Sequence, residues 1–459
     1  MSELKPDLCV LGAGSAGLVV AAGASQMGAS VILLEPGEMG GDCLNYGCVP
    51  SKALLSAAAR TPKPTYADAM ANVERAIAAI APNDSQERFE GLGVQVIRQS
   101  GRFADARTVE TADGTHIRAR RFVIATGASA FIPPVPGLAE TPHLTNETLW
   151  QLQEKPEHLL IMGGGPIGCE MALAHARLGC QVTVIEMASI LPKDDPELVD
   201  LLRQRLLAEG IVLREGVSVE GASGTPGNIM LTLTGGETVT GSHLLVAAGR
   251  KANTGSLNLE AAGIQTERGA VKTDASTLTT NRRVYAIGDV AGGPQFTHAA
   301  GYQAGVVLKR ALFGLFWTKA DHGLMPWVTY TDPELAHIGL NEGMARGKHG
   351  GDIRILRFPF AENDRAIATG KTDGLVKVIT TPKGRILGCS ILGAGAGELI
   401  LPWCLAIQNN LKIGAMAQVV APYPTMSEAS KRAAGSFYTP SLFSPRTRKI
   451  VHWLQRLLP

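Results

Sequence analysis

The sequence predicts an α/β fold that contains an internal repeat and ends in a smaller α+β domain. A glycine-rich turn between a short apolar strand and a helix occurs at residues 12–17 and again at residues 163–168. In each copy an acid follows the first glycine by 23 residues, at Glu35 and at Glu186. Nearer the C-terminus, a strand pattern at 375–379 and a helix pattern at 397–410 indicate the mixed α+β domain.

Length and composition exclude several classes of protein. With 459 residues the chain is long enough for several domains, and its net charge of +2 gives no reason to expect nucleic-acid binding. Seven cysteines are too few for a secreted disulfide framework, and residues 1–7 run directly into a strand, without a signal peptide. No apolar run reaches the ~18 residues of a membrane-spanning helix. We therefore expect a cytoplasmic protein without a transmembrane segment.

The first copy of the repeat has the features of a dinucleotide-binding unit. A strand is expected at 8–11, an Ala-rich helix follows the turn, and the strand at 31–34 leads into Glu35. The glycines permit a tight turn and a close approach to a pyrophosphate at the helix N-terminus, while the acid binds a ribose hydroxyl. The residues predicted to contact this dinucleotide are Gly12, Gly14, Ser15, Ala16, Gly17 and Glu35.

The second copy repeats this plan, with strands expected at 159–162 and 182–186. One Gly-x-Gly-x-x-Gly sequence alone is a weak signal, but two copies in the same strand–turn–helix setting are a strong one. Two units imply two bound dinucleotides. The residues predicted to contact the second are Gly163, Gly165, Pro166, Ile167, Gly168 and Glu186.

Two cysteines, Cys43 and Cys48, lie shortly after the first unit, in the sequence Cys-Leu-Asn-Tyr-Gly-Cys-Val-Pro. On a regular helix they would be too far apart for a disulfide, but Gly47 and Pro50 permit a distorted helix start. A helix N-terminus also favours the thiolate. A zinc site would need a second ligand pair, and no matching Cys/His cluster occurs elsewhere. The pair therefore indicates thiol redox chemistry.

A reactive dithiol beside two dinucleotide units favours FAD in the first unit and a nicotinamide in the second. Apolar strands that end in glycine, at 122–127, 244–250 and 284–289, are expected to pass close to the cofactors, and Asp289 is placed to accept hydrogen bonds from a ribityl chain. These strand ends place Thr126, Gly127, Gly288 and Asp289 at FAD, and Gly249 at the nicotinamide nucleotide.

The chain from about residue 5 to about residue 440 resembles the flavin disulfide reductases, the class I pyridine nucleotide-disulfide oxidoreductases that include dihydrolipoamide dehydrogenase and mercuric reductase. The segments that carry the resemblance are 43–52, 288–289, 331–334, 363–366 and 388–398. The resemblance implies two Rossmann-like dinucleotide-binding domains and a C-terminal α+β dimerisation domain that makes a homodimer. The implied boundaries are 1–149 and 271–324 for FAD, 150–270 for NAD(P), 325–440 for the interface and 441–459 for a tail.

The resemblance also implies roles for the polar residues around the dithiol. Cys48 is the flavin-side sulfur, whose thiolate interacts with oxidised flavin, and Cys43 is the outer thiol that attacks the substrate. Lys52 lies near the flavin N5 edge, where its positive charge stabilises reduced flavin, and Gly41, Lys52, Gly101 and Thr297 are implied as further FAD contacts. Glu170 is the acid that pairs with this lysine, because a buried ammonium without a partner is costly.

The main departure from the family pattern is Tyr423. Reductases of disulfides carry a histidine here, which shuttles protons at the outer thiol of the partner subunit, and the glutamate five residues later is kept as Glu428. A phenol with a pKa near ~10 is a poor general base at neutral pH, whereas imidazole near ~6.5 is well matched. Mercuric reductases have tyrosine at this place, but they also carry a C-terminal cysteine pair, and this chain has no cysteine after Cys404.

The predicted function is an FAD-dependent NAD(P)H oxidoreductase that passes electrons through a redox-active Cys43–Cys48 disulfide. Its acceptor stays open between a small or protein-borne disulfide, such as lipoamide, and a metal ion, and a redox-sensing flavoprotein with weak turnover is the alternative from another class. No resident metal is predicted. NADH is favoured over NADPH because Glu186 would repel a 2′-phosphate, although Lys193 lies nearby.

The C-terminal tail forms a basic amphipathic pattern, with apolar residues at 450, 453, 454, 457 and 458 on one helical stripe. Two alternatives stay open for this tail. It packs against its own body or dimer mate, or it makes a peripheral contact with an anionic membrane.

Overall fold

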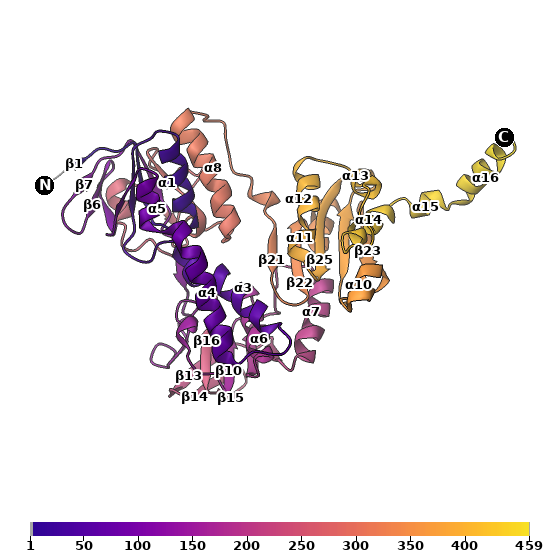
Figure 1. Cartoon of the computed structure of the whole chain (residues 1–459), viewed down its shortest axis with the longest axis horizontal. Helices are drawn as coiled ribbons and strands as arrows, with labels where there is room; N and C mark the ends of the chain where they lie inside the picture. The colour runs from indigo at the N-terminus through magenta and orange to yellow at the C-terminus, as the bar shows by residue number, and fades with distance from the viewer. Residues whose placement is uncertain (1–2, 459) are drawn as a thin grey trace. The chain divides into compact units, whose positions relative to one another are not determined.

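The computed structural model describes residues 3–458, which divide into two compact units (Figure 1). Unit 1 contains the residues up to 188 together with 211–322, and unit 2 contains 189–210 together with the residues from 323 onwards. No helix among residues 3–458 is long and apolar enough to cross a membrane. The finer domain boundaries expected from the sequence stay predictions.

Unit 1 is built on two parallel sheets, one for each copy of the repeat. The first sheet has the strand order β20-β8-β2-β3-β4, with every neighbouring pair parallel. Its central strands are buried on both faces, as the continuous apolar sequence of such strands requires. The strands are β2 (Leu8–Leu11), β3 (Val31–Leu34), β4 (Val94–Ile97), β8 (Arg121–Ile124) and β20 (Val284–Ala286).

The second parallel sheet has the order β12-β11-β10-β16. A three-stranded antiparallel sheet, β13-β14-β15, packs with it around a common apolar core. The first helix of each copy follows its glycine-rich turn directly: α1 (Ser15–Gln26) after β2, and α6 (Pro166–Arg177) after β10. The strands are β10 (His158–Met162), β11 (Gln181–Glu186), β12 (Val212–Glu215), β13 (Val219–Thr225), β14 (Asn228–Leu233), β15 (Thr238–Gly241) and β16 (His243–Val246).

Smaller elements complete unit 1. A four-stranded sheet has the order β1-β7-β6-β5, and α8 (Thr297–Phe313) packs against α1. The helix α4 (Tyr66–Asp84) packs against α3 (Cys48–Ala58). The strands of the smaller sheet are β1 (Glu3–Leu4), β5 (Gly101–Asp105), β6 (Thr108–Thr111) and β7 (His116–Ile117).

Unit 2 contains a five-stranded antiparallel sheet of order β21-β22-β25-β24-β23, with helices packed against it. The helix expected at 397–410 is two helices, α11 (Ala396–Leu399) and α12 (Leu401–Gln408), because Pro402 has no amide proton to continue the hydrogen-bond ladder. The strands are β21 (Trp327–Thr329), β22 (Glu334–Gly339), β23 (Arg354–Pro359), β24 (Leu375–Thr380) and β25 (Ile386–Gly393). Two parallel-sheet units and this α+β domain confirm the predicted fold class.

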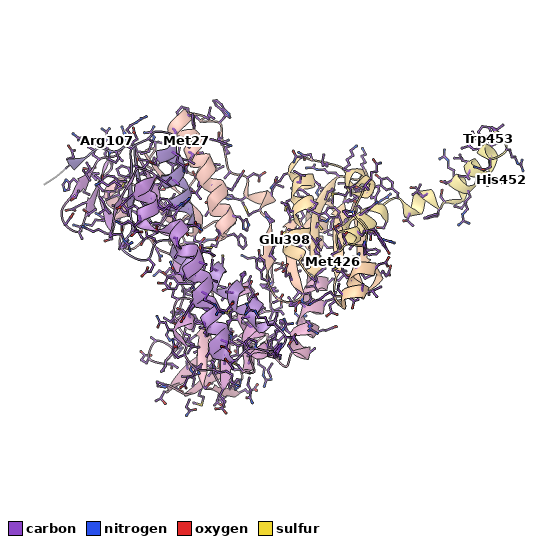
Figure 2. The ribbon with its side chains drawn as sticks, viewed as in Figure 1. Met27, Arg107, Glu398, Met426, His452 and Trp453 are labelled. Carbon is purple, nitrogen blue, oxygen red and sulfur yellow. The ribbon has the colours of Figure 1, made fainter. Side chains whose placement is uncertain are left out.

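The C-terminal arm, residues 439–458, extends from the sheet and helices of unit 2 (Figures 1 and 2). It contains α15 (Thr439–Leu442) and α16 (Pro445–Leu454) and follows α14 (Glu428–Gly435). Figure 2 labels His452 and Trp453 near its end. No residue of α15 or α16 is buried.

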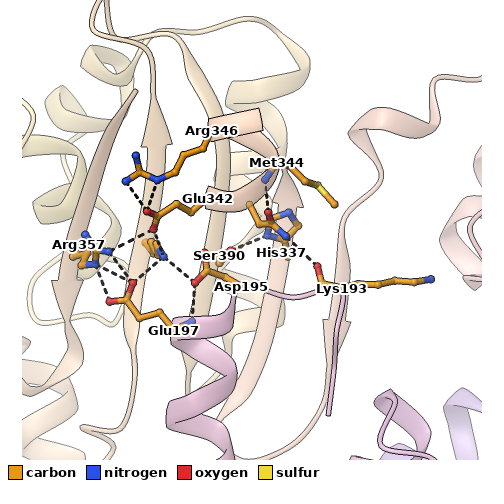
Figure 3. Close-up of polar contacts among 11 residues, drawn as sticks. Lys193, Asp195, Glu197, His337, Glu342, Met344, Arg346, Arg357 and Ser390 are labelled. Atoms are coloured by element: carbon orange, nitrogen blue, oxygen red, sulfur yellow. Dashed lines mark hydrogen bonds and ion pairs between the residues drawn. The ribbon is translucent and has the colours of Figure 1, made fainter. Parts of the chain in front are cut away.

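A buried charge cluster joins α7 (Pro196–Ala208) to the sheet of unit 2 (Figure 3). The ammonium of Lys377, on β24, lies 2.8 Å from a carboxylate oxygen of each of Asp195, Glu197 and Glu342. Burial opposes the charge of Lys377, yet the hydrogen bonds to these three carboxylates raise its pKa. Arg357 binds Glu197 through two nitrogens, and this contact is the main reason that the pKa of Glu197 falls to about 2.

Candidate functional site

The two glycine-rich turns have the same geometry, which fits a dinucleotide pyrophosphate. A Cβ at Gly12 would lie 2.4 Å from the Ala125 carbonyl oxygen, and a Cβ at Gly163 would lie 2.4 Å from that of Ala247. Both glycines have left-handed φ angles, of +108° and +115°. At Gly165 nothing lies within 4 Å of the same Cβ position, which leaves the helix N-terminus of α6 open to an anion.

The two strand-end acids also occupy equivalent places. Glu35 accepts hydrogen bonds from the amides of Ala13, at 2.7 Å, and Gly37, at 2.8 Å. Glu186 accepts from Gly164 at 2.7 Å and Ala188 at 2.9 Å. Each carboxylate is therefore fixed beside the second residue of its own turn, where the ribose of a bound dinucleotide is expected.

A break in the helix separates the two cysteines. Cys43 lies in α2 (Gly41–Asn45), and Cys48 is the first residue of α3. Gly47 stands between the helices with φ −117° and ψ −105°, and a Cβ there would lie 2.9 Å from a carboxylate oxygen of Asp42. A larger residue would therefore clash. The seven cysteines are free thiols, and only Cys48 among them is exposed.

The environment of Cys48 stabilises its thiolate. Its pKa is lowered to about 6, first by a hydrogen bond from the Cys43 thiol and further by Thr297 and the positive charge of Lys52, although the protein around the sulfur partly desolvates its thiolate. The Thr297 hydroxyl lies 3.5 Å from the Cys48 sulfur. Conversely, the hydrogen bond to Cys48 and burial raise the pKa of Cys43. The pair therefore holds one proton at neutral pH, with the negative charge on Cys48.

Lys52 and Glu170 form an ion pair, with a distance of 2.8 Å between the ammonium nitrogen and a carboxylate oxygen. Lys52 lies one turn after Cys48 on α3, and Glu170 lies on α6, where its side chain is only 5% exposed. The resemblance predicted this pairing, and the structure places the two residues together. The ammonium is therefore held on the same side of α3 as the thiolate that it stabilises.

Arg250 is a site residue that the sequence analysis missed. Its guanidinium lies 3.3 Å from Asp289 and 3.3 Å from Asp42, so it connects the strand-end acid to the dithiol segment. Burial raises the pKa of Asp289, and Arg250 opposes this effect. The signal for Arg250 was its position directly after the strand-ending Gly249, but nothing in the sequence indicated its two acidic partners.

The other residues predicted at FAD lie around the edge of the first parallel sheet. Gly288 has a left-handed φ of +74°, donates its amide to the buried Gln303, and leaves room beside Ala16 for close packing. Gly127 follows β8 of this sheet, and Gly249, which was predicted at the nicotinamide nucleotide, follows β16 of the second sheet; nothing lies within 4 Å of a Cβ at either. In contrast, Gly101 starts β5 in a packed position, where a Cβ would lie 2.5 Å from a methyl group of Leu34.

Several other predicted site residues have protein partners in the structure. A Cβ at Gly41 would lie 2.6 Å from the Cα of Gly14, so these two backbones meet closely. The Thr126 hydroxyl donates to the carbonyl of Asn253 at 2.8 Å. Taken together, the open glycine turns, the paired acids and the close backbone contacts fit two dinucleotides, of which FAD and a nicotinamide nucleotide are the expected pair.

Tyr423 lies in unit 2 and is 68% exposed. Its hydroxyl donates a hydrogen bond to Asp364 at 3.0 Å, and this bond raises the pKa of Tyr423. Glu428, the glutamate that this chain shares with the family pattern, starts α14 and adds only a weaker charge effect on that pKa. Asp364 is thus a second residue that the sequence analysis missed, although it belongs to the segment 363–366 that carries the family resemblance.

No group of three or more histidine, cysteine, aspartate and glutamate side chains in the part of the chain that the structure describes could hold a metal ion. The buried cysteines stand in apolar surroundings, and burial raises the pKa of Cys9, Cys180, Cys389 and Cys404. Burial therefore disfavours the thiolate at these four residues, whereas the pKa of Cys48 is lowered.

Two family models match the chain. The pyridine nucleotide-disulphide oxidoreductase model matches residues 6–304, and the dimerisation domain of the same family matches residues 325–434. The mercuric reductase of Lysinibacillus sphaericus is 34% identical over 95% of this chain and 83% of its own length. The dihydrolipoyl dehydrogenase of Geobacillus stearothermophilus is 32% identical over 94% of this chain and 96% of its own.

Two solved structures are also similar to this chain. The Cu(II) complex of the HOCl-induced flavoprotein disulfide reductase RclA from Escherichia coli has a TM-score of 0.87 and 29% identity, over 93% of this chain and 98% of that chain. LpdA from Mycobacterium tuberculosis has a TM-score of 0.86 and 27% identity, over 95% and 99%. Members of the family are FAD-containing and pyridine-nucleotide-dependent, and the matched dimerisation domain supports a homodimer. The chain belongs to the pyridine nucleotide-disulphide oxidoreductase family.

Proposed function

We propose that this protein is an NADH-dependent flavoprotein reductase whose Cys43–Cys48 pair delivers electrons to a soft metal ion. When bound, FAD supplies the two-electron connection between the nicotinamide and the thiol pair. The chain's own part is to hold Cys48 as a thiolate, to place the Lys52 ammonium beside it, and to keep Cys43 protonated until an acceptor arrives.

The observation that carries the choice of acceptor is the Tyr423–Asp364 hydrogen bond. In the family pattern, the residue at this position serves the outer thiol. Dithiol–disulfide exchange needs a base there near neutral pH, and Asp364 moves the phenol pKa further from that range. A metal ion makes no such demand, because it displaces the thiol protons itself as it binds.

Thiol chemistry also favours soft ions. Paired thiolates bind Cu(I) and similar ions preferentially, and a phenol oxygen nearby can complete the coordination for a short time. Two relatives bear on the proposal: one is named as a mercuric reductase, and a similar flavoprotein disulfide reductase has been solved as a Cu(II) complex. In this proposal the metal ion binds the Cys43–Cys48 pair directly, without first passing through a C-terminal cysteine pair.

Steady-state assays with NADH and a panel of acceptors test the proposal. We expect turnover with Hg(II) or Cu(II) to exceed turnover with lipoamide or low-molecular-weight disulfides, and to be lost in Cys43→Ser. Faster turnover with a disulfide than with either ion would overturn the choice of acceptor. Rapid flavin reduction with slow turnover on every acceptor would instead support a redox-sensing flavoprotein.

A further inference from the structure

The C-terminal arm is strongly cationic. After Glu428 the sequence contains no aspartate or glutamate up to its last residue. The basic residues of the arm are Arg446, Arg448, Lys449 and Arg456, and Lys431 and Arg432 precede it on α14. The rest of the chain carries a small excess of acidic residues, because the whole chain has a net charge of only +2. Positive charge is therefore concentrated at one end.

The arm consists of two short helices, α15 and α16, and the longer one is capped at its start. Ser444 caps α16 by accepting a hydrogen bond from the Thr447 amide at 3.2 Å, and Pro445 occupies the first helical turn. α16 ends at Leu454, and the chain continues in a turn in which the amides of Leu457 and Leu458 both donate to the Leu454 carbonyl at 2.9 Å. The two leucines therefore follow directly on the last turn of the helix.

This helix has two chemically distinct faces. At about 100° per residue, the apolar side chains of α16 gather on one side with Ile450 near its centre, and of the basic residues only Arg446, in the first turn, lies on this side. The opposite side is basic, and there Arg456 and His452 lie 3.0 Å apart. The apolar set is Ile450, Val451, Trp453, Leu454, Leu457 and Leu458, and every member is exposed, including Trp453 at 61%. The basic set is Arg448, Lys449, His452 and Arg456.

We propose that the C-terminal arm binds the surface of a membrane that contains anionic phospholipid, with α16 lying in the plane of the interface. A short helix that buries nothing is only marginally stable in water, so this one needs a partner for its apolar face. The charge of the arm selects the partner: an acid-free cationic face complements phosphate headgroups, while the apolar face enters the acyl boundary. Trp453 is of the residue type that occurs at this depth.

Flotation with vesicles tests the proposal on the full-length, FAD-loaded protein. We expect the protein to float with vesicles that contain phosphatidylglycerol, but not with pure phosphatidylcholine, and to be released by high salt. Ile450→Glu places a charge in the centre of the apolar face and should reduce flotation about tenfold or more. Met230→Glu is the matched control, because Met230 is similarly exposed on β14, outside the arm. Flavin content verifies that both variants are folded.

A chain that ends at Phe443 adds a second measurement. We expect it to lose vesicle binding and to keep its oligomeric state in solution. Failure of the full-length protein to float with anionic vesicles would overturn the proposal, and so would undiminished flotation of Ile450→Glu. Conversion of the shortened chain to a smaller oligomer, without vesicle binding by the full chain, would assign the arm to contacts between copies.

Discussion

Lys52 on α3 and Glu170 on α6 lie 2.8 Å apart, so the helix that carries the reactive thiol is tied to the first helix of the second dinucleotide unit. The two residues are 118 positions apart in the sequence. This pairing fixes a positive charge near Cys48 and gives the buried Glu170 carboxylate a cationic partner.

The charge of Lys52 should be visible in the titration of Cys48. Lys52→Met removes a charge that lowers the pKa of Cys48, so that pKa should rise above about 6. Cys43→Ala should raise it further, because the hydrogen bond from Cys43 is the larger cause. Iodoacetamide alkylation of the reduced protein across pH, read at Cys48 by mass spectrometry, measures both. Lys63→Met, on an exposed loop, is the control, and an unchanged midpoint in Lys52→Met would contradict the assignment.

The two cysteines should differ in their effect on the flavin spectrum. Titration of the protein with NADH should bleach the flavin and leave a long-wavelength absorbance from a thiolate beside oxidised flavin. Cys48→Ser should lose this absorbance and Cys43→Ser should keep it, because Cys48 is the sulfur that carries the charge. Retention of the band in Cys48→Ser would reverse the two roles, and a colourless protein would remove the basis for both.

Glu186 should determine the choice of nucleotide. Its carboxylate is held beside the second glycine-rich turn by the Gly164 and Ala188 amides, where it would repel a 2′-phosphate. We expect kcat/KM for NADH to exceed that for NADPH by about tenfold or more, or about 1.4 kcal/mol. Glu186→Gln should reduce the ratio of kcat/KM for NADH to that for NADPH. Glu220→Gln should leave this ratio unchanged, because Glu220 is an exposed acid on β13. A tenfold advantage for NADPH would refute this expectation.

Substitutions at Tyr423 should change the preferred acceptor. Tyr423→His introduces a base of suitable pKa and should raise disulfide reduction, since general-base effects are typically ~10²–10⁴-fold. Tyr423→Phe should slow metal-ion reduction and leave flavin reduction by NADH unchanged. Asp364→Asn is the matched variant, because it keeps the Tyr423 hydroxyl and removes the negative charge that raises the pKa of Tyr423. If Tyr423→Phe leaves turnover with every acceptor unchanged, Tyr423 is only a packing residue and its hydroxyl has no part in the reaction.

The charge cluster in unit 2 should dominate the stability of that unit. Lys377→Met would leave the fully buried Asp195 without its cation, at a cost of about 3–5 kcal/mol in the free energy of unfolding. Urea unfolding followed by fluorescence measures the loss. Lys383→Met, in the exposed turn after β24, should change stability by less than about 0.5 kcal/mol. Equal stability of the two variants would show that the cluster contributes little.

Strands and turns were predictable from the sequence because their signals are local. The apolar runs at 8–11 and 31–34 coincide with β2 and β3, since strands buried on both faces need continuous apolar sequence. The glycine turns were likewise predictable, because only glycine fits where a Cβ would meet a carbonyl oxygen.

Partners that lie far apart in the sequence were not predictable in this way. Asp364 and Tyr423 are 59 residues apart, and Arg250 reaches acids from two other segments. The association of residues 189–210 with unit 2 was also missed, although they lie between two strands of the second parallel sheet. Lys377 on β24 holds this segment through Asp195, and nothing near either residue in the sequence indicates the other.

Because Lys377 is buried, acylation of its amine can report whether unit 2 is folded. Only 3% of it is exposed, and its ammonium is enclosed by three carboxylates, so amine-acylating reagents cannot reach it in the native protein. Exposed lysines such as Lys383 will be acylated in native and unfolded molecules alike. The fraction of chains labelled at Lys377 therefore counts the molecules in which unit 2 has opened, without any spectroscopic probe.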